Sequence, residues 1–181
     1  ALLDLVPAAP AGRLVDIGTG TGRVLELLAP RVRQAVGVDA SKAMLALARS
    51  RLARADLGHC TVRQADMYRL PLPDGMFDVA VLQMVLHYAE DPLGVVVEAA
   101  RVLRPRGRLI VIDFAAHGRE DLTERLAHRW PGFSDDGMRQ LLDEAGLEAG
   151  VTRTIDGPLV VRVWTGARRA DAPAAAPLVT V

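Results

Sequence analysis

The chain has 181 residues, of which half are hydrophobic and 4% aromatic, and its 22 basic and 22 acidic residues give a formal net charge of zero. This length suits one domain with a full hydrophobic core, built mainly from Leu, Val and Ala. Because the charges balance, we do not expect direct contact with nucleic acid, which needs a positive excess on at least one face.

Cysteine usage and hydropathy set further limits. The single cysteine, Cys60, can form neither a disulfide within the chain nor a cysteine-based zinc cluster. No signal peptide is visible, and no apolar run is long enough to span a membrane, so we expect a cytoplasmic location without membrane contact. The chain begins at Ala1 rather than Met, and we expect that it has been trimmed from a longer protein.

Strand-like and helix-like segments alternate along the chain. Short apolar runs predict strands at 13–17, 34–38, 59–64, 77–83 and 108–113. Helices are predicted at 22–29, 42–55, 93–103 and 135–145. Residues 147–155 and 158–165 are expected to form a terminal strand pair, and the Ala/Pro-rich segment 166–181 a tail.

The ends of several elements carry recognisable signals. Ser41 and Ser134 are suitable N-caps, and Gly146 is a suitable helix stop. The helix at 42–55 is expected to bury one face, made of Met44, Leu45, Ala48 and Leu52. Residues 71–75 and 104–107 are predicted turns. The basic residues Arg101, Arg104, Arg106 and Arg108 flank the second turn, and we interpret them as a solvated surface rather than a nucleic-acid contact.

Strands separated by helices predict a mostly parallel sheet with helices on both faces. In such sheets ligands bind at the carboxyl ends of the strands, where the strand order reverses. The loops after the first five strands are therefore expected at the ligand edge, and the 104–107 turn at the opposite edge.

The strongest chemical signal is the glycine-rich run from Asp16 to Gly22, between the first strand and the first helix. Glycines at 18, 20 and 22 permit positive φ and close backbone approach to a ligand. The spacing is not that of a dinucleotide fingerprint, since the sixth position from Gly18 is Arg23, and Gly22 is not followed by the Lys of a P-loop. A tight turn without a ligand is the alternative.

Residues 15–23 resemble motif I of the class I S-adenosylmethionine-dependent methyltransferases, and further similar segments follow in order. Asp39 ends the second strand, Asp66 follows the third, 77–88 resembles the fourth-strand motif, and 103–109 resembles the turn before the fifth strand. The resemblance covers about residues 11–165, and we assign 1–165 to one domain. It implies an α/β, Rossmann-like, doubly wound fold with a mostly parallel seven-stranded sheet and an antiparallel last strand.

The resemblance implies S-adenosylmethionine as the cofactor. The candidate cofactor-binding residues are Asp16, Gly18, Thr19, Gly20, Gly22, Asp39, Ala40, Asp66, Met67 and Gln83. A carboxylate at Asp39 can accept both ribose hydroxyls, and its alternative is a helix cap. Asp66 is either an adenine contact or a surface-loop aspartate. Asp16 either caps the loop or neutralises the cofactor's ammonium through water. No metal is expected.

In this family the acceptor attacks the sulfonium methyl in one displacement, so the protein mainly holds two reactants in line. A base is needed only when the acceptor must lose a proton. His87 and Tyr88 follow the fourth strand and are the catalytic candidates, although a packed or surface histidine is an equal alternative for His87. Asp113 ends the fifth strand and is a possible cap, while His117 and His128 are expected to be solvent-exposed.

Several acceptor classes are disfavoured. The Asn-Pro-Pro-Tyr type of motif is absent after the fourth strand, where residues 82–86 read Leu-Gln-Met-Val-Leu. Arsenic methylation in related enzymes uses several cysteines, and a metal-dependent catechol type needs a carboxylate cluster. A small-molecule acceptor remains.

A second hypothesis belongs to another functional class. Only about a dozen residues precede Asp16, where the family usually has a lid. Residues 118–134 resemble methyltransferase-like domains fused behind ArsR-type repressors. The alternative is therefore a sensor of S-adenosylmethionine or S-adenosylhomocysteine with an upstream DNA-binding domain. An interaction module without a ligand is a third alternative, which the intact glycine loop and Asp39 disfavour.

Overall fold

The structure is a computed structural model, and it describes residues 11–117 and 128–170. These residues form a seven-stranded sheet in the order β3-β2-β1-β4-β5-β7-β6. The strands are β1 (Ala11–Ile17), β2 (Val32–Asp39), β3 (Cys60–Gln64), β4 (Phe77–Gln83), β5 (Leu103–Phe114), β6 (Leu147–Ile155) and β7 (Val161–Arg168). The helices are α1 (Arg23–Leu28), α2 (Lys42–Arg54), α3 (Pro92–Val102) and α5 (Asp135–Glu144), with short 3-10 turns η1 (Ala29–Arg31) and η2 (Leu86–Tyr88).

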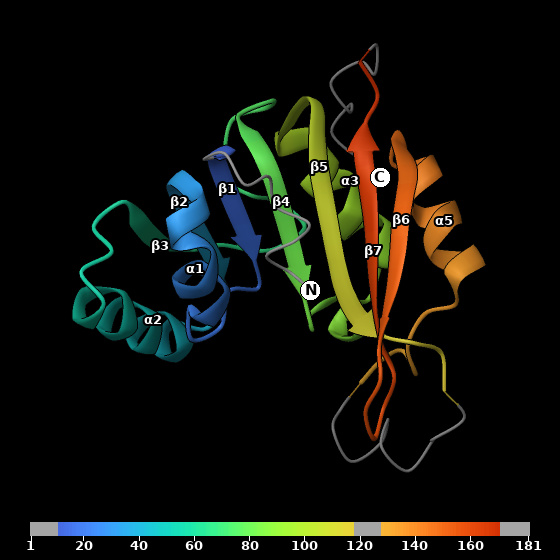
Figure 1. Cartoon of the computed structure of the whole chain (residues 1–181), viewed down its shortest axis with the longest axis horizontal. Coiled ribbons are helices and arrows are strands. Elements are labelled where there is room, and N and C mark those ends of the chain that lie inside the picture. Colours follow the sequence, from blue (N-terminus) through green and yellow to red (C-terminus); the bar gives the residue numbers. More distant parts are fainter. Residues whose placement is uncertain (1–10, 118–127, 171–181) are drawn as a thin grey trace.

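The direction of the strands confirms the predicted fold class. Strand β1 pairs in parallel with β2 and β4, and β2–β3 and β4–β5 are parallel as well. Strand β7 is antiparallel to both of its neighbours, β5 and β6. In Figure 1 the arrowheads of β1, β4 and β5 point to the lower edge and that of β7 points upward. The carboxyl ends of the parallel strands therefore share one edge.

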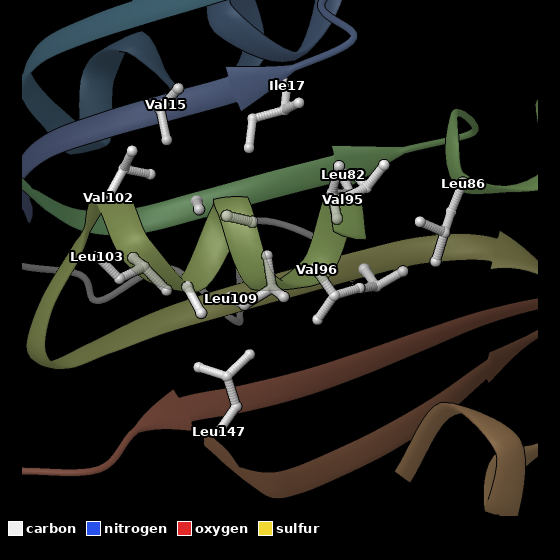
Figure 2. Packing of buried hydrophobic residues seen from close by; sticks show 14 of the residues in the cluster. Val15, Ile17, Leu82, Leu86, Val95, Val96, Val102, Leu103, Leu109 and Leu147 are labelled. Carbon is white, nitrogen blue, oxygen red and sulfur yellow. The ribbon is translucent and has the colours of Figure 1, made fainter. Parts of the chain in front are cut away.

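Two hydrophobic clusters cover the two faces of the sheet. On one face, Val24, Leu25 and Leu28 of α1 and Leu52 of α2 pack against β1, β2 and β4. On the other face α3 covers the central strands and α5 lies against β6 and β7, and Figure 2 shows Val95 and Val96 of α3 among side chains from β1, β4 and β5. Both clusters are mainly aliphatic, as expected from the low aromatic content, and the second also contains Phe77, Phe133 and Trp164.

The predicted helix ends are confirmed, with one error on a helix face. Ser41 Oγ accepts a hydrogen bond from Met44 N at 3.3 Å, and Ser134 Oγ accepts one from Gly137 N at 3.0 Å. Gly146, at φ 77°, follows α5. The expected burial of Met44 is wrong, because its side chain is 40% exposed while Leu45, one position on, points into the core.

The predicted turn at 104–107 lies inside strand β5. Leu103 pairs with Phe77 and Arg108 with Val79, so β5 has more residues than β4 between the two pairs and bulges outward. Within the bulge Arg106 has a positive φ of 63°, the left-handed conformation that bends the strand there. Helix α3 accordingly ends at Val102 and β5 begins at Leu103, five residues before the predicted strand.

The basic run around this bulge is largely bonded within the protein. Arg101 is bonded to Glu98 and Asp74 and donates to the carbonyl of Leu72. Arg104 pairs with Asp78 at 2.6 Å. These contacts support the interpretation of a structural surface, and they lie at the edge opposite the predicted ligand site.

The tail was predicted to begin at residue 166, and this boundary is wrong. Strand β7 continues to Arg168, whose guanidinium is buried and donates to the carbonyls of Arg101 and Leu103. Those carbonyls lie at the end of α3, where a cationic side chain is favourable. The rest of the predicted tail, from residue 171, lies outside the described residues.

None of the described helices is both long enough and apolar enough to cross a membrane.

Candidate cofactor and acceptor site

The strand order reverses at β1, which lies between β2 and β4. The chain runs outward from β1 to β2 and β3, then returns to the other side of β1 for β4 and β5. In open α/β sheets ligands bind at the carboxyl ends of the strands beside such a reversal, in the crevice between the loops after β1 and β4. The candidate cofactor-binding residues lie at or just after the carboxyl ends of β1, β2, β3 and β4.

The glycine loop is held by the end of β2. The N–H groups of Gly18 and Thr19 both donate to the carbonyl of Val38, at 2.8 and 2.9 Å. The next N–H, on Gly20, donates to Asp39 Oδ2 at 2.8 Å. Three consecutive donors of the loop are thus engaged within the protein. The loop is not arranged as a phosphate cradle, in agreement with its spacing in the sequence.

The three glycines have different roles. A Cβ at Gly18 would lie 2.6 Å from Val85, and one at Gly22 would lie 3.1 Å from Ala48, so these two positions permit packing of the loop after β4 and of α2. A Cβ at Gly20 would meet nothing within 4 Å. All three have positive φ, between 51° and 76°. Gly20 is therefore the position at which the backbone faces open space that a ligand can fill.

Asp39 connects the two loops and is not the cap of α2. Its Oδ1 accepts from Ser41 N at 2.8 Å, while Oδ2 accepts from Gly20 N. Ser41 itself caps the helix, as the sequence suggested. Each carboxylate oxygen keeps a further lone pair, and the residue is only half-buried, so both can still accept hydroxyl donors.

Asp16 is a buried carboxyl group beneath the glycine loop. It is 1% exposed, and its Oδ2 accepts from Thr19 Oγ1 at 2.6 Å. Its Oδ1 is buried without a hydrogen-bond partner among the described residues. Burial raises the pKa of this carboxyl to about 7; the hydrogen bond from Thr19 acts to lower the pKa and the charge of Asp39 to raise it.

The loop after β3 lies beside the end of β2. Ala65 N donates to the carbonyl of Asp39 at 3.1 Å, and Gln64 Nε2 donates to that of Ala40 at 3.1 Å. Asp66 is exposed, and its Oδ1 accepts a hydrogen bond from Tyr68 N at 3.0 Å. This bond forms an Asx-turn that stabilises the loop. The other member of the candidate pair, Met67, is half-buried against the core.

The loop after β4 completes the edge. Gln83, the last residue of β4, pairs with Ile112, and Met84 follows at φ 53°. Such a conformation is costly for a residue other than glycine and is common at functional sites. It places Val85 against Gly18, so the loop after β4 directly contacts the glycine loop.

His87 forms a buried pair with Asp113, at the end of β5. Its Nδ1 lies 2.7 Å from Asp113 Oδ1, and the backbone N–H groups of Leu86 and His87 donate to Oδ2 at 3.0 and 3.3 Å. Asp113 also accepts from Phe114 N at 2.8 Å. His87 is 1% exposed, which favours the packed alternative over direct contact with an acceptor, whereas Tyr88 is 46% exposed.

His128 was predicted to be exposed, and this is wrong. It is 8% exposed and its ring lies 4.2 Å from that of His87, while Phe114 stacks on it at 5.5 Å. Burial lowers the pKa of the His128 imidazole below its ordinary value, and nearby His87 acts in the same direction. His117 is half-buried, with its ring centroid 6.1 Å from that of Phe114, so it is less exposed than predicted.

Sequence reasoning missed two connections at this edge. Asp113 is a candidate or a cap from its sequence position, and its pairing with His87 was missed, although an acid at the end of a central strand is a recognisable partner for a histidine after the neighbouring strand. Tyr68 was not singled out; its hydroxyl accepts from Glu90 N at 2.7 Å and Asp91 N at 3.3 Å, joining the loops after β3 and β4. No local signal in the sequence predicts the second contact.

Within 11–117 and 128–170, no group of three or more His, Cys, Asp or Glu side chains is placed to hold a metal ion.

A parallel sheet closed by antiparallel β7, a glycine loop after β1 and a carboxylate after β2 define the class I S-adenosylmethionine-dependent methyltransferases. Residues 15–111 match the family model described as "Methyltransferase domain", which is more than half of the chain. The chain belongs to this methyltransferase family, and the cofactor of the family is S-adenosylmethionine.

Similar proteins agree with this assignment. The chain is 35% identical over 163 residues to a 27-O-demethylrifamycin SV methyltransferase of Amycolatopsis mediterranei, covering 81% of the chain and 58% of that protein. It is 33% identical over 116 residues to the uncharacterized methyltransferase YcgJ of Bacillus subtilis, covering 64% of the chain and 46% of YcgJ. The chain spans between 32% and 58% of the first three curated relatives it matches.

The fold is shared with solved structures. The crystal structure of YcgJ from Bacillus subtilis has a TM-score of 0.81 at 19% identity, covering 93% of the chain and 96% of YcgJ. A geranyl diphosphate methyltransferase in complex with S-adenosylmethionine has a TM-score of 0.82 at 17% identity, covering 92% and 82%. The named relatives are methyltransferases, and they give no support to the ArsR-type resemblance. That resemblance was carried by 118–134, of which 118–127 lie outside the described residues.

The residues present fit the cofactor. A Cβ at Gly20 would meet nothing within 4 Å, so no side chain covers the loop backbone at this position. The Asp39 carboxylate beside it suits the paired hydroxyls of a ribose, and the unpartnered oxygen of Asp16 suits a nearby positive charge.

Proposed function

We propose that the chain transfers the methyl group of S-adenosylmethionine to a small-molecule acceptor at the carboxyl edge of the sheet. The observation that carries this proposal is the hydrogen bond from Gly20 N to Asp39 Oδ2, which sets a carboxylate next to the one loop glycine whose Cβ position is open. Together these features suit the ribose and the adjoining part of an adenosyl amino acid.

In this proposal each candidate residue contacts a particular part of the cofactor or holds the loop that does so. Asp39 accepts from the ribose hydroxyls, with Ala40 next to it. Gly20 permits the close approach, while Gly18, Thr19 and Gly22 hold the loop in shape. Asp16 balances the positive charge of the amino-acid part, and Asp66 and Met67 border the adenine. Bound cofactor supplies a methyl group on a positively charged sulfur, so positioning accounts for much of the catalysis.

The acceptor side follows β4. Gln83 is half-buried there and Tyr88 is exposed, and Tyr88 is the catalytic candidate that can touch an acceptor. His87 lies behind Tyr88, with ring centroids 4.1 Å apart, and Asp113 fixes its orientation. In this proposal His87 positions Tyr88, and it takes up an acceptor proton only if the covering side chains part.

A small-molecule acceptor is supported by two observations. The sequence after β4 lacks the Asn-Pro-Pro-Tyr type of motif. The names of two relatives, 27-O-demethylrifamycin SV methyltransferase and demethylmenaquinone methyltransferase of Thermus thermophilus, are those of enzymes acting on small molecules. Cytoplasmic location and an upstream DNA-binding domain stay predictions.

The test is a transfer assay with methyl-labelled S-adenosylmethionine and a panel of phenols, quinols, carboxylic acids and amines. We expect labelled product and S-adenosylhomocysteine in equal amounts with at least one acceptor. Tyr88→Phe is expected to slow transfer without changing cofactor affinity, and Gly20→Val to abolish both.

Three outcomes are distinguishable. Transfer to an acceptor supports the proposal. Absence of both cofactor binding and transfer overturns it. Cofactor binding with no transfer to any class in the panel contradicts the catalytic role and favours the sensing alternative.

A further inference from the structure

A cavity of ≈ 400 Å³ lies between the start of α3 and one side of α5. Leu93 of α3 and Leu141 of α5 contribute apolar surface, and Trp130 and Phe133, from the segment before α5, contribute aromatic surface. The volume lies within the range of about 300–1,000 Å³ that is typical of small-molecule sites. Among the described residues that line it there is no candidate cofactor-binding or catalytic residue, so the cavity is separate from the site proposed above.

Trp130 presents an aromatic surface that the protein holds in place. The residue is 40% exposed, although a large aromatic side chain gains most from burial. Its indole N–H donates to the carbonyl of Ala89 at 2.8 Å, and its backbone N–H donates to that of His87 at 3.2 Å. Phe133, which is 7% exposed, stacks on the indole with ring centroids 6.1 Å apart. Because the indole is already fixed, a ligand that contacts it loses little free energy in ordering it.

The rim of the cavity is acidic. The carboxylates of Glu90, Asp91 and Glu144 line it, and no basic residue does so within the described part of the chain. Asp91 is the N-cap residue of α3, yet its side chain makes no capping hydrogen bond. Glu144 lies in the last turn of α5, where the helix dipole disfavours a negative charge, and its Oε1 accepts from Gln140 Nε2 at 2.8 Å.

One basic side chain lies close to this rim. Arg129 Nη2 pairs with Glu90 Oε1 at 2.6 Å, but the two side chains are 55% and 71% exposed, and such exposed pairs contribute little. Neither Asp91 nor Glu144 forms an ion pair with any residue that the structure describes. The aromatic surface is therefore bordered by negative charge from both helices.

We propose that this cavity binds a small organic ammonium ion that carries an aromatic or branched apolar group. The apolar group packs against Leu93, Leu141 and the indole of Trp130, where it leaves water. The ammonium group lies among the rim carboxylates, and a cation near the face of an indole is stabilised further by the ring quadrupole. An organic anion of the same shape is repelled by the same carboxylates. The inference does not depend on the proposed cofactor site.

The test is a titration followed by nuclear magnetic resonance of the ¹⁵N-labelled protein near pH 7 at low salt. The probes are 2-phenylethylammonium, the neutral 2-phenylethanol and the anionic 3-phenylpropionate. The chain has two tryptophans, and Trp164, which is 2% exposed with its indole N–H bonded to Asp135, serves as an internal reference. We expect the indole signal of Trp130 to shift to saturation with the ammonium ion while that of Trp164 stays in place.

The three probes should differ in affinity. We expect 2-phenylethylammonium to bind about 3- to 30-fold more tightly than 2-phenylethanol, the range measured for cations at aromatic faces, and 3-phenylpropionate to bind most weakly. Added salt should reduce the preference, because the rim carboxylates are accessible to solvent. Equal affinity for the ammonium ion and the alcohol, or no shift of the Trp130 signal, overturns the inference.

Variants assign the preference to the rim. Asp91→Asn and Glu144→Gln should each weaken binding of the ammonium ion and leave that of the alcohol unchanged, whereas Glu148→Gln, an exposed acid on β6 outside the cavity, should change neither. An unshifted Trp164 signal shows that each variant is folded. Unchanged affinity in both rim variants overturns the inference. Self-association of the chain that Glu144→Gln abolishes would also overturn it, because the surface would then be an interface between two copies.

Discussion

Both oxygens of the Asp39 carboxylate already accept a backbone N–H, one from the glycine loop and one from Ser41. The residue therefore shapes the crevice as well as offering acceptors to a ribose. Removing it should loosen the glycine loop and take away two hydrogen-bond acceptors together.

We predict that Asp39→Ala weakens binding of S-adenosylhomocysteine by about 1.5–3 kcal/mol, or about 10- to 150-fold, the range typical of hydrogen bonds to a charged group. Asp39→Asn keeps one acceptor oxygen and should lose less. Calorimetric titration of the two variants measures the difference. Unchanged affinity in Asp39→Ala would show that the Asp39 carboxylate does not contact the ligand.

The buried acid at position 16 should also affect stability. Its pKa is about 7 in the folded chain and near 3.8 when unfolded, so the folded state holds the proton more tightly. Stability that this group contributes at low pH is therefore lost as pH rises from about 4 to 7, by about 2–4 kcal/mol at 1.36 kcal/mol per pKa unit.

Asp16→Asn removes this titration, so in the absence of ligand the variant should gain stability relative to the unaltered chain as pH rises. Urea unfolding of both proteins near pH 5 and pH 8 measures the gain. A stability difference that is the same at both pH values would show that the folded carboxyl has an ordinary pKa.

At the level of single residues, the sequence predicted the acids and glycines of the cofactor side but not how they are connected. The spacing of Gly18, Gly20 and Gly22 does not reveal that only Gly20 faces open space. The burial of His128 also lacked a local signal, because it depends on contacts with β4 and β5, which are distant in sequence.

Strand β2 holds the glycine loop through side-chain packing as well as hydrogen bonds. Gly37, in the middle of this strand, lies against Thr19 and Leu25. A Cβ there would be 2.6 Å from Thr19 Oγ1 and 2.8 Å from Leu25 Cδ1. The absence of a side chain at position 37 is therefore a condition for seating the loop and α1 on the sheet.

We expect Gly37→Ala to destabilise the chain by about 1–3 kcal/mol, the usual cost of overpacking a core. The matched control is Gly58→Ala, where a Cβ meets nothing within 4 Å and the change should stay within about 0.5 kcal/mol. Thermal unfolding compares the two. If Gly37→Ala and Gly58→Ala unfold at the same temperature, α1 and the glycine loop can shift to make room for the added methyl group, and the prediction is wrong.

Among the elements, helices with clear caps and fully buried strands were predictable, because their signals are local. Errors fell where tertiary contacts override a local pattern. Arg104–Gly107 has the composition of a turn, yet pairing of Leu103 with Phe77 extends β5 across it. Residues 166–168 have few strand signals and belong to β7 because β5 and β6 pair with them.

For the molecule as a whole, the alternation of strands and helices predicted the doubly wound sheet, and the antiparallel β7 followed from the resemblance. The reversal of strand order at β1 then brings together loops that are far apart in sequence. This is why Gly20, Asp39 and the loop after β4 meet at one edge, although Gly20 and Asp39 are 19 residues apart and the loop after β4 is more distant still in the sequence. The acceptor, in contrast, depends on side chains outside the family motifs.

The most direct test of the account is a crystal structure of the protein with S-adenosylhomocysteine. We predict electron density for the adenosyl group above Gly20, with both ribose hydroxyls within hydrogen-bonding distance of Asp39 and the amino group on the side of Asp16. Density for the ligand at another edge of the sheet, or none above Gly20 at saturating concentration, would contradict the central claim.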